Sequence, residues 1–290
     1  MRITGRTRLA GIMGWPVTHS RSPALHNFWI DEHGIDGAYV PLAVRPEHLG
    51  QALRALPALG FRGCNLTLPH KQAALAIVDR ADPLARRIGA INTIVVAVDG
   101  SLEGSNTDVF GFRENLRERV PDWKASAGPA VVLGAGGASR AIVAALLEAR
   151  VEEIRIVNRT LARAERLASD LASPTTRITI HPWSERDTVQ RDAGLLVNTT
   201  SLGMSGEAEL GIDLARLPQS AVVIDIVYVP LETDLLAAAK QRGNPTVDGL
   251  GMLLHQGRPG FEAWFGSPVQ ATRELRAAVL TTLGATGAAR

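Results

Sequence analysis

The stretch AVVL at Ala130–Leu133, followed by GAGGASR at Gly134–Arg140, decides the fold of this chain. The four apolar residues predict a short buried strand, and a helical stretch is expected at Ala141–Ala149. Glycines between a strand and a helix let the backbone turn sharply and approach a phosphate, whose charge is stabilised at the helix N-terminus. The order of strand, glycine loop and helix therefore predicts a dinucleotide-binding unit. The loop departs from the fingerprint G-x-G-x-x-G, because Ser139 stands at the position of the third glycine.

The end of the next predicted strand, Glu153–Val157, favours NADP over NAD. An NAD site usually has Asp or Glu at this point, where the carboxylate hydrogen-bonds the ribose 2′-hydroxyl. Here the strand is followed by Asn158-Arg159-Thr160, with Arg163 close behind, and no carboxylate stands at the tip. Guanidinium groups match phosphate oxygens, so Arg159 and Arg163 are candidates for binding a 2′-phosphate. The alternative is that both arginines are solvated residues at the start of a helix.

The pattern around this unit divides the chain into two α/β domains. Residues 111–249 are expected to form a Rossmann-like, doubly wound NADP-binding domain. Residues 1–110 are expected to form a substrate domain with a mostly parallel sheet, completed by helices from 250–290 that pack back on it. Further predicted elements of the second domain are a helix at Thr160–Leu171, strands at Gly194–Val197, Val222–Ile226 and Pro245–Val247, and a helix at Leu231–Gln241.

The first domain alternates between strand and helix signals. Ser22 is a candidate N-cap in front of Pro23, and the helix it begins ends near Gly34. The dipeptide Asp99-Gly100 between two β-prone runs predicts a hairpin at an edge of the sheet. The remaining predicted elements are strands at Leu9–Met13, Ala38–Val44 and Phe61–Leu66, and helices around Leu49–Leu56, Lys71–Val78 and Asp108–Val120.

Composition excludes several classes of protein. The chain has 290 residues, 46% hydrophobic, and 31 basic against 29 acidic residues give a net charge of +2. So small an excess cannot make a nucleic-acid surface by bulk charge. Cys64 is the single cysteine, which excludes an intrachain disulfide and fits a reducing cytoplasm. No stretch reaches the ~18 apolar residues of a membrane span, and the N-terminus lacks the apolar run of a secretory signal.

Polar residues cluster where strands of the first domain are predicted to end. The clusters are His19–Ser22, Asn65–Lys71, Ile91–Thr93 and Asn106–Asp108. In open α/β sheets, ligands bind outside the carboxyl ends of the strands. Hydroxyls, amides, a lysine and an aspartate suit a polyhydroxylated, anionic small molecule. The histidines in and beside these clusters form no tight ligand set, so no metal site is expected.

Nine motifs, in order from Ile12 to about Phe265, resemble those of the shikimate dehydrogenase family. Because nine motifs occur in the same order, the probability of a chance match is very small. The set is far more specific than the glycine loop alone. The motifs are GWPVTHSRSPALHN (14–27), NLTLPHK (65–71), GAINT (89–93), NTDVFGF (106–112), GAGGASR (134–140), NRT (158–160), NTTSLGM (198–204), DIVYVPLETDLL (225–236) and DGLGMLLHQ (248–256).

The resemblance implies NADPH-dependent, reversible reduction of 3-dehydroshikimate to shikimate, in the biosynthesis of chorismate and aromatic amino acids. It implies that Lys71 and Asp108 are the catalytic pair, Lys71 as acid or base and Asp108 as the group that orients it. The implied substrate-binding residues are Ser20, Ser22, Thr67, Asn92, Tyr228 and Gln256. The implied cofactor-binding residues are Gly134, Ala135, Gly136, Gly137, Ala138, Asn158, Arg159, Thr160, Arg163, Thr200, Met204 and Gly249.

Two other functions stay open at the level of sequence. One is a broader quinate/shikimate dehydrogenase that uses NAD or NADP, because changes near Ser20, Ser22 and Tyr228 would shift the substrate. The other is a non-catalytic NADP-binding sensor, against which the presence of both Lys71 and Asp108 speaks. Each residue also has a plain structural reading: Lys71 as a solvated lysine, Asp108 and Ser22 as helix caps, and Tyr228 as a core aromatic. The expected partner is a small molecule rather than a nucleic acid or a membrane, in a monomer or a homodimer.

Overall fold

The computed structural model describes residues 3–284. The chain folds into two compact units. One takes in the residues up to Thr107 together with those from Leu253 onward, and the other is Asp108–Met252. We describe each unit by itself. Within residues 3–284, no helix combines the length and the apolar composition that crossing a membrane requires.

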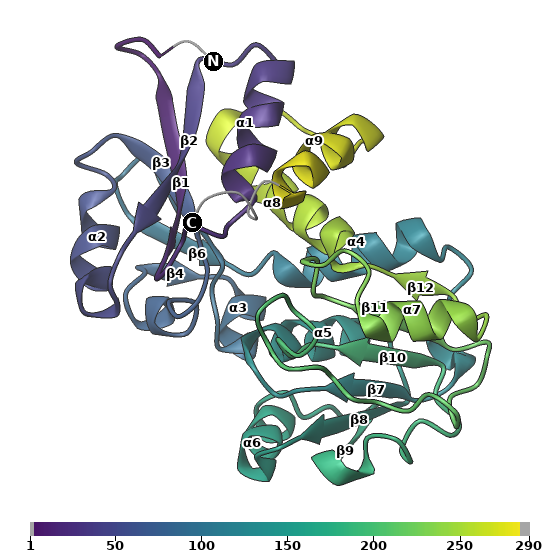
Figure 1. Ribbon diagram of the computed structural model, residues 1–290. Helices are drawn as coiled ribbons and strands as arrows, with labels where there is room; N and C mark the ends of the chain where they lie inside the picture. The colour runs from purple at the N-terminus through teal and green to yellow at the C-terminus, as the bar shows by residue number, and fades with distance from the viewer. Residues whose placement is uncertain (1–2, 285–290) are drawn as a thin grey trace. The chain divides into compact units, whose positions relative to one another are not determined.

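The first unit is built on one six-stranded sheet (Figure 1). Its order is β2-β1-β3-β5-β6-β4, in which β1 pairs in parallel with β2 and β3, and β5 runs antiparallel to β3 and β6. The predicted hairpin is confirmed, although two-residue β4 rather than the hairpin forms that edge. The strands are β1 (Arg8–Gly14), β2 (Gly37–Ala43), β3 (Phe61–Leu66), β4 (Arg80–Ala81), β5 (Thr93–Val96) and β6 (Leu102–Ser105).

Two helix predictions in this unit need correction. Arg21 occupies the N-cap position of helix α1 (Ser22–Glu32) without a side-chain capping bond, and Ser22 is the first residue of the helix rather than its N-cap. Residues 71–78 do not form an α-helix, because only Ala73–Ala76 make a 3₁₀ turn there. Helix α3 (Pro83–Ile88) was not predicted, and it is capped by Asp82, whose side chain accepts the Ala85 N–H. The other helical elements of the unit are α2 (Leu49–Ala55) and a 3₁₀ turn at Pro46–His48.

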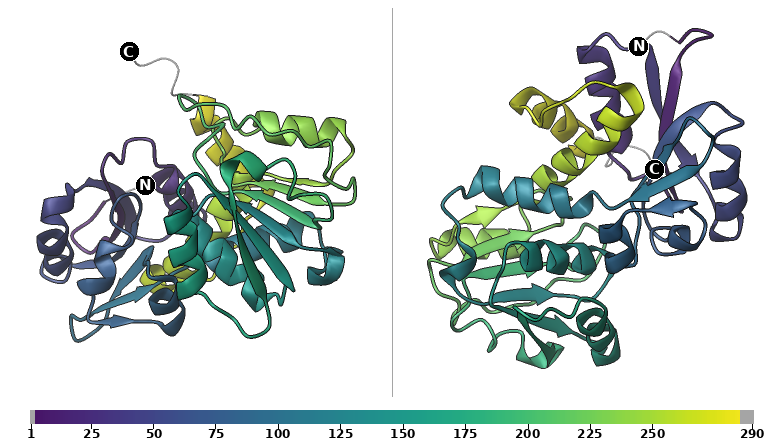
Figure 2. Two further views of the ribbon diagram at one scale, coloured as in Figure 1. Left: turned by 90° about the horizontal axis from the view of Figure 1, so that it is seen from below. Right: turned by 180° about the vertical axis from the view of Figure 1, so that it is seen from behind.

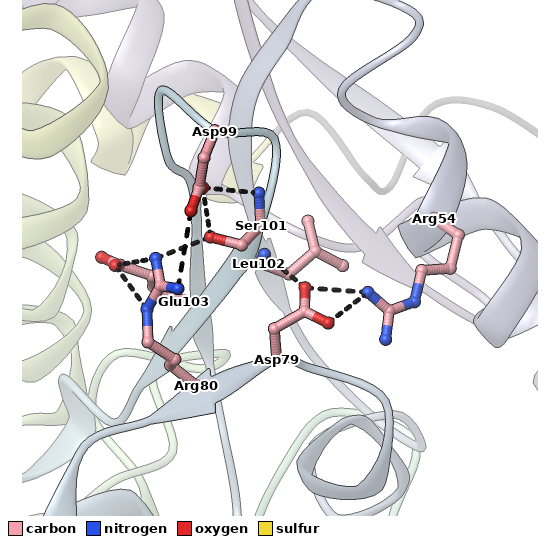
Figure 3. A network of polar contacts seen from close by, with 7 residues as sticks. All are labelled: Arg54, Asp79, Arg80, Asp99, Ser101, Leu102 and Glu103. Carbon is pink, nitrogen blue, oxygen red and sulfur yellow. Dashed lines mark hydrogen bonds and ion pairs between the residues drawn. The ribbon is translucent and has the colours of Figure 1, made fainter.

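A network of charged side chains fastens the β4 edge to its neighbours (Figure 3). Arg54 of α2 donates to both carboxylate oxygens of Asp79, at 2.7 and 2.8 Å. Asp79 also accepts the backbone N–H of Leu102 at 2.8 Å. Arg80 pairs with Glu103 at 2.8 Å, and Ser101 links it to Asp99 in the hairpin turn. Strand β4 forms few backbone hydrogen bonds with its neighbour, so these side-chain contacts stabilise its position at the edge of the sheet.

Replacing Asp79 by asparagine is expected to lower the melting temperature in a pH-dependent way. The Leu102 N–H, and then Arg54, hold the pKa of Asp79 below its ordinary value of 3.8. A carboxyl with a lowered pKa in the folded state contributes stability above the unfolded value, and loses it as pH falls through the folded value. The melting-temperature gap between wild type and Asp79→Asn should therefore be present at neutral pH and shrink below 3.8. If the difference in melting temperature were the same at neutral pH and below pH 3.8, the proposed contribution of ionised Asp79 to stability would be contradicted.

The C-terminal helices pack on the first unit (Figure 2). Helix α9 (Arg273–Gly284) lies against α1, and α8 (Gly249–Phe265) continues into this unit from Leu253. Trp264 donates its indole N–H to the Ile94 carbonyl of β5 at 2.9 Å. Trp29 of α1 donates likewise to the carbonyl of Gln270 at 3.0 Å. Buried aromatic rings whose N–H groups are hydrogen-bonded stabilise the packing of the C-terminal segment on the first unit.

The second unit is a fully parallel six-stranded sheet of order β12-β11-β10-β7-β8-β9. The order runs outward in both directions from β7, so right-handed crossovers place α5 and α6 on one face and α7 on the other (Figure 1). The doubly wound prediction is confirmed. The strands are β7 (Ala130–Leu133), β8 (Glu153–Asn158), β9 (Arg177–Pro182), β10 (Leu195–Asn198), β11 (Val222–Asp225) and β12 (Thr246–Val247); the helices are α4 (Asp108–Arg119), α5 (Gly137–Glu148), α6 (Leu161–Asp170) and α7 (Asp234–Gln241).

Two features of this unit differ from the sequence prediction. Helix α5 begins at Gly137, inside the glycine loop, four residues before the predicted Ala141. Strand β9 was not predicted, because its residues are only half-buried and lie at the edge of the sheet, where the apolar pattern is weak. Both strands beside the glycine loop, β7 and β10, are completely buried.

Candidate active site

Three strand ends of the first unit meet at one place. Strand β3 ends where antiparallel β5 begins, and β6 ends beside it, with Asn65 opposite Thr93 and Thr93 opposite Ser105. Backbone bonds tie the adjoining loops together: Leu66 N–H donates to the Asn92 carbonyl, and Ile91 N–H to the Lys71 carbonyl, each at 2.8 Å. The loops that carry the polar clusters at 65–71, 91–93 and 106–108 are therefore tied to one another by these backbone bonds and strand pairs.

Asn92 is held in one orientation. Its Oδ1 accepts the backbone N–H of Thr107 at 2.8 Å and the hydroxyls of Thr107 and Thr93 at 3.1 Å each. The side chain is only 3% exposed. Because three donors use the oxygen, the orientation of the Asn92 amide group is fixed.

Asn65 links Asn92 to the start of α1. Its Nδ2 donates to the Asn92 carbonyl at 3.1 Å and to Thr93 at 3.0 Å, while its Oδ1 accepts the Tyr39 hydroxyl at 2.6 Å. Tyr39 also hydrogen-bonds to Ser22, and its ring stacks on His26 with centroids 4.1 Å apart. Burial lowers the pKa of His26 to about 3, against the effect of its hydrogen bond to Asn65, so His26 is neutral at physiological pH.

The two candidate serines stand at the N-terminus of α1. Ser22 is 8% exposed and is the first residue of the helix, and its backbone N–H donates to the hydroxyl of Ser20. A helix N-terminus and two hydroxyls favour an anion. Thr67, which follows β3, lies against the end of β1, because a Cβ on Gly14 would come within 2.4 Å of its methyl group. Only a residue without a side chain at position 14 lets the loop of Thr67 approach so closely.

The remaining candidates fall on separate elements. Lys71 is half-buried in the loop after β3. Asp108 is 2% exposed, begins α4 and directly follows Thr107, whose backbone binds Asn92. Gln256 lies on α8 next to Gly257, which packs against Leu25 and His26 of α1. Tyr228 follows β11 in the unit of residues 108–252, and is half-buried.

The glycine loop of the second unit fits a pyrophosphate. Gly134 has φ +108°, and a Cβ there would lie 2.8 Å from Thr199 Oγ1, so this position requires glycine. At Gly136 and Gly137, in contrast, a Cβ would meet no atom within 4 Å. Packing within the chain does not explain these two glycines, whereas a ligand that approaches the N-terminus of α5 would. Ala135 and Ala138 complete this loop, and both are half-exposed.

The end of β8 presents basic side chains without a carboxylate. Asn158 ends the strand and its side chain donates to the Thr160 carbonyl at 2.7 Å, which fixes the turn into α6. Arg159, Thr160 and Arg163 are exposed on this turn and on the first turn of the helix. The structure therefore offers two guanidinium groups at the position where a ribose 2′-substituent is read.

A buried carboxyl holds the loops after β10 and β11. Asp225 accepts hydrogen bonds from Asn198 Nδ2 at 3.0 Å, the Val227 backbone N–H at 3.0 Å and the Thr233 hydroxyl at 2.7 Å. Burial raises the pKa of Asp225 to about 6, against the effect of these donors. The same loops carry Tyr228, Thr200 and Met204, and Gly249 lies against the carbonyl of Ile226, where a Cβ would come within 2.2 Å.

Replacing Asp225 by alanine is expected to destabilise the protein by about 1–3 kcal/mol, because three buried donors lose their acceptor. Asparagine should cost less, since it keeps an oxygen. The raised pKa of Asp225 sets the direction of the pH dependence of stability. Between pH 3.8 and about 6 the folded state holds a proton that the unfolded state releases, so stability falls as pH rises through this window. Denaturant unfolding should show this slope in wild type and not in Asp225→Asn. An unchanged slope would contradict the assignment.

No cluster of three or more His, Cys, Asp or Glu side chains able to hold a metal ion occurs within residues 3–284.

Two models of known protein families match this chain. Residues 12–94 match the shikimate dehydrogenase substrate binding domain, and residues 116–228 match the shikimate / quinate 5-dehydrogenase domain. The chain belongs to the shikimate dehydrogenase family.

Curated relatives within this family cover almost the entire chain. The shikimate dehydrogenase (NADP(+)) of Rhodospirillum rubrum is 62% identical over 280 residues, which are 96% of this chain and 99% of the relative. The enzyme of the same name from Paramagnetospirillum magneticum is 60% identical over 279 residues, 96% of this chain and 100% of the relative.

Solved structures share the fold. A Thermus thermophilus shikimate 5-dehydrogenase in complex with NADP(H) and shikimate is 37% identical, with a TM-score of 0.84 over 95% of this chain and 99% of that one. A Corynebacterium glutamicum quinate dehydrogenase in complex with NAD is 31% identical, with a TM-score of 0.86 over 96% and 99% of the two chains.

Sequence reasoning did not single out several residues that organise these sites. Asn65, Thr93 and Thr107 stood inside the quoted motifs, but their side-chain partners are far apart in the sequence. Tyr39 had no signal beyond being a tyrosine on a strand. Asp225 was quoted in a motif without a role, and only its burial and three donors reveal what it does.

Proposed function

We propose that this protein is an NADP-dependent shikimate dehydrogenase that reversibly reduces 3-dehydroshikimate to shikimate. The observation that carries the proposal is the single polar cluster at the strand ends of the first unit. In this proposal the Asn92 amide acts together with the hydroxyls of Ser22 and Thr67 and the ammonium group of Lys71. Such a set complements a molecule with one carboxylate and several ring hydroxyls.

In this proposal the first unit binds the substrate. The helix N-terminus and hydroxyls at Ser20 and Ser22 bind the carboxylate, and Gln256 of α8 adds a further contact. Thr67 and Asn92 bind ring hydroxyls. Lys71 transfers a proton to the forming alkoxide during reduction and accepts it in the reverse direction. Asp108 hydrogen-bonds a ring hydroxyl and orients Lys71. Acid–base help of this kind contributes about 10²–10⁴-fold to the rate.

The second unit holds the cofactor in this proposal. Gly137 and Ala138 at the start of α5 receive the pyrophosphate, Arg159 and Arg163 bind the 2′-phosphate, and the loop at 198–204 lies beside the nicotinamide end. When bound, NADPH supplies the hydride. The open space above Gly136 and Gly137 and the basic, carboxylate-free turn after β8 support this assignment.

The experiment that tests the proposal follows NADPH absorbance with purified protein, shikimate and NADP⁺, with quinate and NAD⁺ in parallel. We expect rapid turnover with shikimate and NADP⁺ alone. Comparable rates with quinate or NAD⁺ would favour a broader quinate/shikimate dehydrogenase. The Corynebacterium glutamicum quinate dehydrogenase of similar fold is in complex with NAD. Binding of NADP⁺ without turnover in any combination would favour a sensor and would remove the catalytic roles of Lys71 and Asp108.

A cytoplasmic location is part of the proposal. Cys64, the single cysteine, is buried and free, and burial raises the pKa of its thiol above its usual range. A thiol of this kind is inert and needs no oxidising environment.

A further inference from the structure

The third glycine position of the dinucleotide loop is taken by Ser139, and the structure accounts for this departure. Ser139 is 0% exposed and lies in the first turn of α5. Its Oγ accepts the backbone N–H of Gly136 at 3.0 Å and hydrogen-bonds to the hydroxyl of Thr199 at 2.5 Å. Thr199 directly follows β10, so one side chain joins the glycine loop to the loop after a neighbouring strand.

The direction of each hydrogen bond in this group is determined. Thr199 donates its hydroxyl hydrogen to the Leu133 carbonyl at 2.6 Å. Ser139 must therefore donate its own hydrogen to Thr199 Oγ1, while one of its lone pairs accepts Gly136 N–H. The order is Gly136 N–H to Ser139, Ser139 to Thr199, and Thr199 to the last residue of β7. Every hydrogen in the relay has an acceptor.

The same hydroxyls also set the shape of the loop. A Cβ on Gly134 would come within 2.8 Å of Thr199 Oγ1 and 3.4 Å of Ser139 Oγ, so both oxygens pack against the backbone at the first glycine. The N–H of Gly136 points to Ser139 and is not offered to a ligand. The first N–H groups of a helix have no acceptor within the helix, so those of Gly137 and Ala138 are the ones that can bind an anion.

We propose that Ser139 and Thr199 are positioning residues for the cofactor, which hold the N-terminus of α5 and the loop after β10 in the arrangement that receives the pyrophosphate. This inference rests on the proposed use of NADP. Neither side chain is required to touch the cofactor. Their effect is to fix the loop before binding, so that less conformational freedom is lost when the ligand arrives.

The test compares Thr199→Val, which removes the hydroxyl and keeps the shape, with Thr199→Ser, which keeps the hydroxyl, and with Ser139→Ala. The dissociation constants of NADP⁺ and of adenosine 2′-monophosphate, which lacks the pyrophosphate, are measured by calorimetry. Thr176→Val is the matched control, because Thr176 is 6% exposed in the same unit and donates its hydroxyl to the Val151 carbonyl at 2.8 Å.

We expect Thr199→Val and Ser139→Ala each to weaken NADP⁺ binding by about tenfold, the effect of one lost buried hydrogen bond. Thr199→Ser should restore wild-type binding. Adenosine 2′-monophosphate should bind all variants about equally, and Thr176→Val should lower the melting temperature without changing either constant. The inference would be overturned if the folded Thr199→Val or Ser139→Ala variant bound NADP⁺ as tightly as wild type. It would also be overturned if a variant lost affinity equally for NADP⁺ and for adenosine 2′-monophosphate. Failure of the wild type to bind NADP⁺ would instead overturn the proposed function.

Discussion

Lys71→Ala lowers kcat for shikimate oxidation by about 10²–10⁴-fold, with a much smaller change in KM, as the expected result of removing the general acid–base group. The loop after β3 holds Lys71 beside Asn92, because the Lys71 carbonyl accepts the Ile91 N–H at 2.8 Å. This bond belongs to the backbone and survives the substitution. The loop should therefore stay in place, and the loss should fall on proton transfer rather than on binding.

Steady-state kinetics with NADP⁺ and shikimate give both constants, and calorimetry gives shikimate affinity directly. Lys124→Ala is the matched control, since Lys124 is exposed and lies in the unit of residues 108–252. A small primary amine added to Lys71→Ala should recover part of the rate by replacing the missing ammonium group. Unchanged kcat would remove Lys71 from the chemistry, and a raised KM with unchanged kcat would make it a binding residue only.

Simultaneous replacement of Arg159 and Arg163 by alanine has the second-largest expected effect. Charge-assisted hydrogen bonds contribute about 1.5–3 kcal/mol each, so loss of two should weaken NADP⁺ binding by about 10²-fold or more. NAD⁺ has no 2′-phosphate, and its binding should change little. The preference for NADP⁺ over NAD⁺ should therefore collapse, although the absolute activity with NAD⁺ need not rise.

The ratio of kcat/KM for the two cofactors measures this preference. Arg166→Ala is the control, because Arg166 is exposed on the same helix, further from its start. It removes one unit of positive charge without a predicted 2′-phosphate contact. A parallel loss with both cofactors would show that the arginines stabilise the turn after β8 and do not read the 2′-phosphate.

Much of the second unit could be predicted from the sequence, because its signals are local. The apolar run of β7 and the glycines at 134 and 136 act within a few residues of one another, and their order specifies strand, loop and helix. Strand β9 was not predicted because an edge strand buries few apolar side chains. The helix expected at 71–78 is only a short 3₁₀ turn. The predicted Ser22 cap was wrong because local pattern does not show which residue has the last non-helical backbone.

The sequence by itself determined the fold class, the hairpin, the glycine loop and the identity of the chemical groups. Only the tertiary structure decided how these groups are oriented. The Asn92 amide is fixed because its oxygen accepts from Thr107, and the Ser139 hydroxyl hydrogen-bonds to Thr199. These partners are separated by 15 and 60 residues. Hydrogen bonds of this kind depend on which strands become neighbours in a sheet, and no pattern within a short stretch of sequence contains that information.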